Sequence, residues 1–349
     1  MIKQANYIKL LSSVVAGMSL SLTLNYSVIG SKVFAQVPLS QSTDYLAQAN
    51  ITVEDLQGFN GVVKSLAVTP DGQLLLVATG DGLLSAIDLE TKEILYSKAV
   101  LVNNYSSIAF NLEKDILVVG DDQTVMILSL STGRKLSFLR EHTGKVSDVA
   151  ISPDGNNIVS VSGDDRTIRI WDLESGELIK TIGANIGPTT SVQYTPDGTL
   201  FITGAIGDDR TFKFWDATTF ELLNTSSQQP GFINDLKISS DGTQLVAAVR
   251  NFVKSWDLTT LKQTRSMKGP KLEINTIAVS PDNRTVATAN KEGTVMLFDL
   301  ATGRKITTLQ GHRGWVLSLA FSPDGQFLYS GAEDKIVKVW QLQPYMKSL

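Results

Sequence analysis

A short polar corner, Pro-Asp-Gly or a close variant, recurs at nearly constant intervals, and this period constrains the fold more than any other feature of the chain. Copies read "VTPDGQ" from Val68, "ISPDGN" from Ile151, "YTPDGT" from Tyr194 and "FSPDGQ" from Phe321. The acidic residues of the corners are Asp71, Asp154, Asp197, Asp241, Asp282 and Asp324. The gaps between them are 83, 43, 44, 41 and 42 residues, and Glu113 lies near the middle of the first gap. Seven units of about 42 residues therefore fill nearly all of the chain after residue 50.

Each unit is expected to form a small antiparallel sheet. In the last unit, "VLSLAF" from Val316 alternates between two faces and is rich in β-forming residues, so it predicts a strand. Pro323-Asp324-Gly325 then supplies a tight turn, because proline presets φ and glycine accepts the left-handed conformation. "QFLYSGA" and "IVKVWQL" predict two more strands, and runs such as "GRKITTLQG" from Gly303 predict a fourth strand between units.

Sheets of this size must stack on one another, because a lone four-stranded sheet cannot bury both faces. Residues 51–349 show no helical periodicity of useful length. The period therefore predicts an all-β fold, a seven-bladed β-propeller with four-stranded antiparallel blades. The chain ends after a third strand, and "ITVEDL" from Ile51 resembles the fourth-strand run "ITTLQG" from Ile306. We expect residues 51–56 to complete the last blade, which would close the ring as a monomer.

Several residues connect these units to a known family. Trp171-Asp172, Trp215-Asp216 and Trp256-Asp257 each end a predicted third strand, and Gly311-His312 opens the last unit. In this combination the chain resembles the WD-repeat family of seven-bladed propellers, as a bacterial-type exported member. The resemblance covers about 300 of the 349 residues.

The resemblance implies a buried tetrad of His, Ser or Thr, Asp and Trp that joins the strands of a blade by side-chain hydrogen bonds. The last unit matches it with His312, Ser330, Asp334 and Trp340, and the third unit with His142, Ser160, Asp165 and Trp171. Other units depart from it, since Ile87, Leu128 and Phe298 replace the tryptophan and no unit besides these two has a histidine. We expect those blades to depend on packing alone.

The resemblance also implies partner-binding positions on the upper face of the ring, two per blade, near the start of the first strand. They are Val62 and Lys64, Asn104 and Ser106, Lys145 and Ser147, Pro188 and Thr190, Phe232 and Asn234, Glu273 and Asn275, and Trp315 and Leu317. We select Trp315, Leu317, Phe232, Asn234, Lys145, Lys64, Glu273 and Asn275 as the candidate binding set. Trp315 stands out because the family pattern does not need tryptophan there for folding, and tryptophan is a frequent interface hot spot. The alternative is that Trp315 only packs on a neighbouring loop.

The first 35 residues differ from the repeats. Lys3 and Lys9 precede an uncharged stretch at 10–30, and Val33-Phe34-Ala35 places small residues where a signal peptidase reads them. We interpret residues 1–35 as a cleaved export signal, residues 36–50 as a linker and residues 51–349 as the propeller. The predicted location is therefore periplasmic or extracellular. The alternative is an uncleaved membrane anchor through residues 10–30, and only then would the protein contact a membrane.

Composition argues against most catalytic and cofactor chemistry. The chain has no cysteine, and its two histidines fall at tetrad positions, so none remains for a triad or a zinc site. "GDDRT" at 163–167 and 207–211 superficially resembles a calcium loop but lies where a hairpin turn belongs. A net charge of −4 and a pI near 5.3 argue against nucleic acid as a partner. We predict no metal, no cofactor and no catalytic residues.

The sequence therefore favours a non-enzymatic scaffold that binds a protein or peptide on the upper face of the propeller. The alternative is a propeller enzyme of the lyase, lactonase or dehydrogenase type, with its site at the central channel. Such activities generally need clustered His, Asp and Glu near the axis, or a quinone or metal site.

Overall fold

The computed structural model describes residues 25–29, 32–36, 51–99, 105–183 and 187–342. These ranges contain thirty strands and no helix, so no described helix has the length and apolarity of a membrane span. The chain divides into two compact units, residues 1–46 and residues 47–349. In the first unit, β1 (Asn25–Ile29) pairs with β2 (Lys32–Gln36) as an antiparallel hairpin. Most of the predicted export signal, the alternative anchor and the linker lie outside the described residues and stay predictions.

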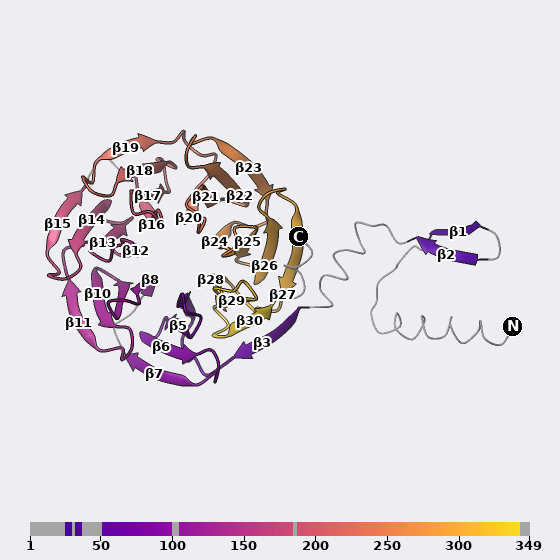
Figure 1. The fold of residues 1–349 in the computed structure, drawn as a ribbon, viewed down its shortest axis with the longest axis horizontal. Coiled ribbons are helices and arrows are strands. Elements are labelled where there is room, and N and C mark those ends of the chain that lie inside the picture. Colours follow the sequence, from indigo (N-terminus) through magenta and orange to yellow (C-terminus); the bar gives the residue numbers. More distant parts are fainter. Residues whose placement is uncertain (1–24, 30–31, 37–50, 100–104, 184–186, 343–349) are drawn as a thin grey trace. The chain divides into compact units, whose positions relative to one another are not determined.

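The second unit is a ring of seven four-stranded antiparallel sheets, which confirms the predicted seven-bladed propeller (Figure 1). The innermost strands of blades one to seven are β4 (Val63–Val68), β8 (Tyr105–Asn111), β12 (Val146–Ile151), β16 (Thr189–Tyr194), β20 (Ile233–Ile238), β24 (Ile274–Val279) and β28 (Val316–Phe321). The second strands are β5 (Leu74–Thr79), β9 (Ile116–Asp121), β13 (Asn157–Ser162), β17 (Leu200–Ala205), β21 (Gln244–Val249), β25 (Thr285–Asn290) and β29 (Phe327–Ala332).

The two outer layers of the ring follow the same order. The third strands are β6 (Leu83–Asp88), β10 (Thr124–Ser129), β14 (Thr167–Asp172), β18 (Phe212–Asp216), β22 (Phe252–Asp257), β26 (Thr294–Asp299) and β30 (Val337–Gln341). The outermost strands are β7 (Ile94–Ala99), β11 (Lys135–Leu139), β15 (Leu178–Ile182), β19 (Leu222–Thr225), β23 (Gln263–Lys268), β27 (Lys305–Gln310) and β3 (Thr52–Leu56).

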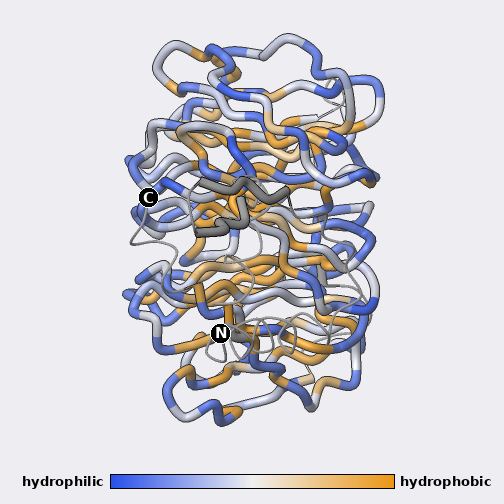
Figure 2. Tube along the Cα trace, turned by 90° about the vertical axis from the view of Figure 1, so that its right-hand side faces the viewer, coloured by the Kyte–Doolittle hydropathy of each residue, from blue (hydrophilic) through white to orange (hydrophobic). Residues whose placement is uncertain are grey.

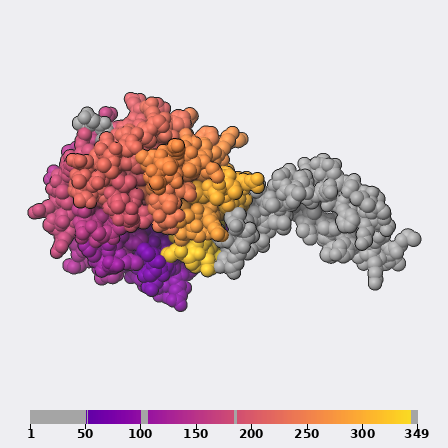
Figure 3. Space-filling model, turned by 45° about the horizontal axis from the view of Figure 1, so that its top comes forward, coloured from indigo at the N-terminus to yellow at the C-terminus, as the bar shows by residue number. Residues whose placement is uncertain are grey.

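The seventh blade takes its outermost strand from the other end of the propeller segment. Strand β3 pairs antiparallel with β30, from Thr52 opposite Gln341 to Leu56 opposite Val337. The ammonium of Lys338 also lies 2.5 Å from a carboxylate oxygen of Asp55 across this pair. Figure 3 shows the indigo start of the propeller beside its yellow last blade. Separating the first and last blades therefore requires breaking backbone hydrogen bonds as well as side-chain packing.

The recurring corners join the innermost and second strands, and their residues explain the turn. In the last blade the Ser322 hydroxyl donates to the Asp324 carboxylate at 2.6 Å, and the Gln326 amide donates to the same oxygen at 2.9 Å. Gly325 has a φ of 69°, which favours glycine. The Asp324 carboxylate thus accepts hydrogen bonds from donors of the turn that have no partner in the strand pairing.

Apolar side chains fill the spaces between neighbouring blades in seven clusters, one for each pair. Figure 2 shows hydrophobic residues along the strands and hydrophilic residues toward the two faces of the ring. Blades seven and one approach so closely that a Cβ at Gly331 would lie 2.3 Å from a methyl carbon of Val63. The stable unit is therefore the interface between blades rather than the single blade.

Candidate protein-interaction surface

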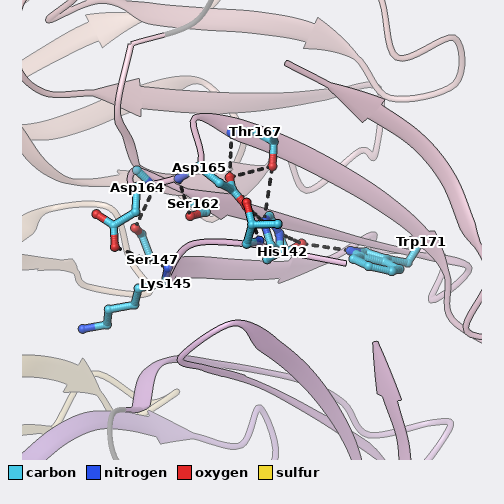
Figure 4. Close-up of polar contacts among 11 residues, drawn as sticks. His142, Lys145, Ser147, Ser162, Asp164, Asp165, Thr167 and Trp171 are labelled. Atoms are coloured by element: carbon cyan, nitrogen blue, oxygen red, sulfur yellow. Dashed lines mark hydrogen bonds and ion pairs between the residues drawn. The ribbon is translucent and has the colours of Figure 1, made fainter. Parts of the chain in front are cut away.

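The four predicted tetrad residues of the third blade lie together in one hydrogen-bond chain, of which Figure 4 labels His142, Asp165 and Trp171. The Trp171 indole N–H donates to the Ser160 hydroxyl oxygen at 2.9 Å, and Ser160 lies 2.8 Å from His142 Nε2. His142 Nδ1 lies 2.8 Å from the Asp165 carboxylate. Because the Asp165 carboxylate can only accept, Nδ1 donates to it, and Nε2 of the neutral ring accepts the proton of Ser160.

The seventh blade repeats this arrangement with small changes in distance. The Trp340 indole N–H donates to Ser330 at 2.8 Å, Ser330 lies 2.7 Å from His312 Nε2, and Nδ1 lies 2.9 Å from Asp334. Both histidine side chains are completely buried. Burial lowers the pKa of both imidazoles despite the neighbouring carboxylates, so the neutral rings suit this donor order. All polar members are satisfied inside the blade, which gives both tetrads a structural role.

The fourth blade corrects the expectation that blades without a histidine depend on packing alone. The Trp215 indole donates to the Thr203 hydroxyl at 3.0 Å, which reproduces half of the tetrad. The Lys213 ammonium lies 2.5 Å from the Asp209 carboxylate. Burial acts to raise the pKa of Asp209, but hydrogen bonds from Lys213 and Thr211 outweigh it and lower that pKa. Lys213, on the third strand of this blade, thus supplies Asp209 with the hydrogen-bond donor that a histidine supplies in blades three and seven.

The upper face carries the loops that lead into the innermost strands and those between second and third strands. Four candidate residues near the start of innermost strands, Lys64, Asn234, Asn275 and Leu317, line the axial cavity. The Asn234 amide donates to the Ile274 carbonyl of the next blade at 2.8 Å, and Asn275 donates to the Val316 carbonyl at 3.3 Å. Both asparagines therefore connect neighbouring blades, which is a structural role beside any contact with a partner.

Farther from the axis, large apolar side chains are exposed on three consecutive blades. Phe232 is 44% exposed on the fifth blade and Trp315 is 42% exposed on the seventh. Leu272, 44% exposed, lies in the loop between them and entering the sixth blade; it is outside the predicted set. The Lys291 ammonium lies 4.4 Å from the centroid of the Trp315 ring. Trp315 thus contacts a neighbouring loop and also keeps much of its ring open to solvent.

The remaining candidates lie on the same face without joining this apolar group. Figure 4 shows the Lys145 side chain extending away from the tetrad, while its backbone N–H donates to Asp164 at 3.3 Å. Glu273 is partly buried beside Leu272. Asn104 lies outside the described residues, and Ser106 belongs to β8. The structure therefore places four candidates at the cavity, leaves Phe232 and Trp315 exposed outside its lining, and puts Lys145 and Glu273 in neither group.

The axial cavity has a volume of about 440 Å³ and is lined by charged groups from blades one, three and five. Asp148 accepts the Val192 amide of the next blade at 2.8 Å, and Asp235 accepts the Ile277 amide in the same way at 2.9 Å. Lys237 lies 3.1 Å from Asp235. Both carboxylates connect neighbouring blades by hydrogen bonds, so their role in the cavity is chiefly structural.

Burial raises the pKa of Asp148, because a charged carboxylate is poorly solvated in the channel wall. Burial acts to lower the pKa of Lys237, but the carboxylates of Asp235 and Asp148 outweigh it and raise that pKa. No group of three or more His, Cys, Asp or Glu side chains suited to a metal occurs within the described ranges. Among the described residues, the charged side chains that line this channel are Lys64, Asp148, Asp235 and Lys237, and an enzyme site there would depend on them.

Sequence comparison gives the family. The family model described as "WD domain, G-beta repeat" matches residues 133–172, 176–216, 261–299 and 303–341. An uncharacterized WD repeat-containing protein of Synechocystis is 59% identical over 253 residues, which cover 72% of this chain and 73% of the relative. The chain belongs to the WD-repeat family. Each matched repeat of this WD-repeat protein runs from the outermost strand of one blade to the third strand of the next.

More distant relatives match shorter parts of this WD-repeat protein. The small ribosomal subunit protein RACK1y of rice is 38% identical over 92 residues, or 26% of each chain. The transcription factor unc-37 of Caenorhabditis elegans is 31% identical over 98 residues, which are 28% of this chain and 16% of that protein. WD-repeat propellers of this kind typically act as protein-interaction scaffolds.

Sequence reasoning missed Asp148, Asp235 and Lys237 in the channel of this WD-repeat protein, although the repeat contains a signal for Lys237. Two residues after the channel-facing position, five blades carry alanine: Ala67, Ala109, Ala150, Ala278 and Ala320. Gln193 and Lys237 take this position in blades four and five. An alignment of all seven units, residue by residue, would have marked Gln193 and Lys237 as departures from the alanine that the other units share.

Proposed function

We propose that this WD-repeat protein is a non-enzymatic scaffold that binds a protein or peptide on the upper face of blades five to seven. The main support for this proposal is that Phe232, Leu272 and Trp315 are exposed on consecutive blades of that face. Equivalent positions on other blades hold residues such as Lys145 and Pro188, so the fold itself does not require large apolar groups there. Exposed apolar groups that folding does not need are typical of binding sites.

Affinity capture tests this proposal. Tagged wild-type protein and a Phe232→Ala/Trp315→Ala variant would be compared for proteins recovered from the envelope fraction of the source cells. We expect the variant to lose its partners by roughly tenfold or more, since interface aromatics often contribute about 2 kcal/mol each. Leu178→Ala/Leu223→Ala is the matched control, because both leucines are exposed at the outer edge of the ring. Equal recovery by all three proteins would reject this docking face.

The scaffold and enzyme alternatives differ in a measurement that needs no substrate. Enzymes at the channel of a propeller generally require a metal, a quinone or clustered ionisable groups, and Asp148 and Asp235 are both engaged between blades. Elemental analysis of protein purified without chelators would decide. A metal present at one equivalent per chain and lost from an Asp148→Asn variant would favour the enzyme.

We also propose that the protein works outside the cytoplasm. The basis is the sequence of the first 35 residues, in which Lys3 and Lys9 precede an uncharged stretch and Ala35 ends a small-residue motif. N-terminal sequencing of protein from cell fractions tests it. We expect a mature chain that begins at Gln36 in an extracytoplasmic fraction; an intact N-terminus on cytoplasmic protein would contradict export.

A further inference from the structure

Phe232, Leu272 and Trp315 each have a cationic residue in side-chain contact, in backbone hydrogen bonding or next to them in the chain. The Lys291 ammonium lies over the Trp315 ring at 4.4 Å from its centroid. The Arg250 amide donates to the Phe232 carbonyl at 3.1 Å, which places the two residues side by side. Lys271 directly precedes Leu272 in the chain. Apolar group and cation thus recur as a pair on three neighbouring blades.

A backbone hydrogen bond joins the loops of blades five and six, and the Lys291–Trp315 contact joins those of blades six and seven. The Ile274 amide, at the end of the Leu272 loop, donates to the Arg250 carbonyl at 2.7 Å. Ile274 is also opposite Asn290, the residue before Lys291. In the next blade the Glu333 amide donates to the Trp315 carbonyl at 3.0 Å. We call this surface, Phe232, Leu272 and Trp315 with their loops, the docking surface.

The docking surface carries more cations than anions, although the whole chain has a net charge of −4. Its cationic residues are Arg250, Lys271, Lys291, Arg313 and Lys335, and none of them forms an ion pair with any described residue. Its anionic residues outside the tetrad are Glu273, Glu292 and Glu333. A Glu333 oxygen accepts the Trp315 amide at 3.1 Å, so part of this negative charge is already hydrogen-bonded.

The pairing of apolar groups with free cations selects the chemistry of a partner. A large apolar side chain can pack on the open part of Trp315, and a carboxylate one or two residues away can reach Lys291. A basic segment would instead place like charges together as it desolvates them, which costs free energy and slows association. Repeating this pairing over three blades favours an extended segment.

We propose that the docking surface binds an extended acidic peptide in which carboxylates alternate with large apolar side chains. This inference rests on the proposed scaffold function and specifies the partner of that same face. Lys291, Arg250 and Lys271 pair with the carboxylates, and Trp315, Phe232 and Leu272 pack against the apolar side chains.

Peptide selection followed by charge swapping tests the proposal. A random twelve-residue peptide library displayed on phage would be selected on the immobilised full-length chain, and peptides also retained by Phe232→Ser/Trp315→Ser would be discarded. We expect the remainder to be rich in Asp, Glu, Leu and aromatic residues and poor in Lys and Arg. A synthetic peptide from this pool should bind Arg250→Glu/Lys291→Glu roughly tenfold more weakly or worse, with increasing salt reducing the difference.

The controls separate a charge effect from misfolding. Lys135→Glu/Lys262→Glu reverses two exposed lysines at or next to outermost strands, away from the docking surface, and should leave peptide affinity and melting temperature unchanged. Replacing the acidic residues of the peptide with lysine should restore binding to Arg250→Glu/Lys291→Glu and weaken binding to wild type. A structural defect would not show this exchange.

Three outcomes would overturn the inference, and they differ in what else they reject. Selected peptides that need Phe232 and Trp315 but are neutral or basic would reject the acidic partner and leave the scaffold function standing. A uridine oligonucleotide that binds with the same dependence on Trp315 would replace the peptide with nucleic acid. A pool with no dependence on either aromatic residue would reject the docking surface and the proposed function together.

Discussion

At the scale of single residues, each tetrad depends on one serine hydroxyl. Ser160 and Ser330 each accept an indole N–H and donate to an imidazole, so each serine satisfies two buried polar groups at once. Both serines are completely buried. Removing such a hydroxyl costs more than one hydrogen bond, because it leaves both a buried indole N–H and a buried imidazole nitrogen without a hydrogen-bond partner.

The variant Ser330→Ala should therefore lower the free energy of unfolding by about 2 kcal/mol, the cost of leaving buried polar groups unsatisfied. Chemical denaturation followed by tryptophan fluorescence measures this loss. Ser266→Ala is the control, because Ser266 is exposed on the outermost strand of the fifth blade. A loss at Ser330 no larger than at Ser266 would contradict the hydrogen-bond chain.

The two histidines predict how stability depends on pH. Burial lowers their pKa in the folded state below 6.5, so the unfolded chain binds more protons as pH falls through that value. Their contribution is complete above pH 6.5 and declines on acidification toward their folded pKa. We expect the melting temperature of wild type to fall more steeply between pH 7.5 and 5 than that of His142→Gln/His312→Gln, which has no histidine left.

The double variant should also be less stable at neutral pH, where the tetrads of wild type are intact. Other titrating groups, including the channel carboxylates, are shared by both proteins and cancel in the comparison. Parallel melting curves over the whole pH range would show that the histidines do not titrate on unfolding.

At the scale of elements, β3 carries the closure of the ring. Its five residues pair with β30, and Leu56 and Ile51 pack against the clusters on either side of the seventh blade. Without β3, the exposed edge of β30 would have unpaired backbone groups. Strand β3 thus contributes far more to the stability of the propeller than five residues of a flexible segment would.

Deleting residues 51–56 should destabilise the propeller by on the order of 5 kcal/mol, at about 1 kcal/mol for each of five paired residues. Thermal unfolding followed by circular dichroism measures the loss. A synthetic peptide with the sequence of residues 51–56 should raise the melting temperature of the deleted protein, and a scrambled peptide should not. An unchanged melting temperature after deletion would mean that β3 does not close the ring.

At the scale of the whole molecule, stability belongs to a closed cycle of interfaces. Every blade contributes to two clusters, and blades seven and one are joined by packing, by the β3–β30 ladder and by the Leu66 amide donating to Ser318 at 2.9 Å. At the other interfaces the chain runs directly from the outermost strand of one blade into the innermost strand of the next, so a covalent link holds the two blades near each other. The pairing of β3 with β30 therefore joins the first and last blades, where a ring made from one chain would otherwise open.

A circular permutant separates the contribution of the β3–β30 pairing from that of the side-chain contacts between blades seven and one. Joining Leu342 to Val53 through a copy of the 301–304 turn, with the new N-terminus at Gln57, builds the last blade from consecutive strands. The permutant should keep the fold but unfold roughly tenfold faster or more, because no strand pairing then joins blades seven and one. Stopped-flow unfolding in denaturant measures the rate against unpermuted residues 51–342. Equal rates would show that the exchanged strand adds no kinetic stability.

The fold was predictable from sequence because each blade repeats the same local instructions. Corners such as Pro323-Asp324-Gly325 and strands such as Val316–Phe321 are decided by turn chemistry and by alternation, both of which are local. The period of about 42 residues then leaves few ways to bury both faces of each sheet. The two tetrads followed from the family pattern in the same way.

The candidate site was predictable only in part. Trp315 and Phe232 were identified at positions where the family pattern does not ask for aromatic residues, and the structure leaves both exposed. Leu272 was missed because it lies one residue before the expected position in a loop. The positions of Asn234 and Asn275 were identified, but their hydrogen bonds to the next blade depend on a contact about 40 residues away in the chain.

By itself, the sequence determined the blade, its corners, the number of blades and the family, because strand and turn preferences act between residues that are close along the chain. Only the tertiary structure decided which side chains meet across blades: Lys291 over Trp315, Asp148 and Asp235 in the channel, and Lys213 in place of a histidine. Those contacts depend on the distance and rotation between neighbouring sheets. Packing over the whole ring sets both quantities, and no single repeat encodes them.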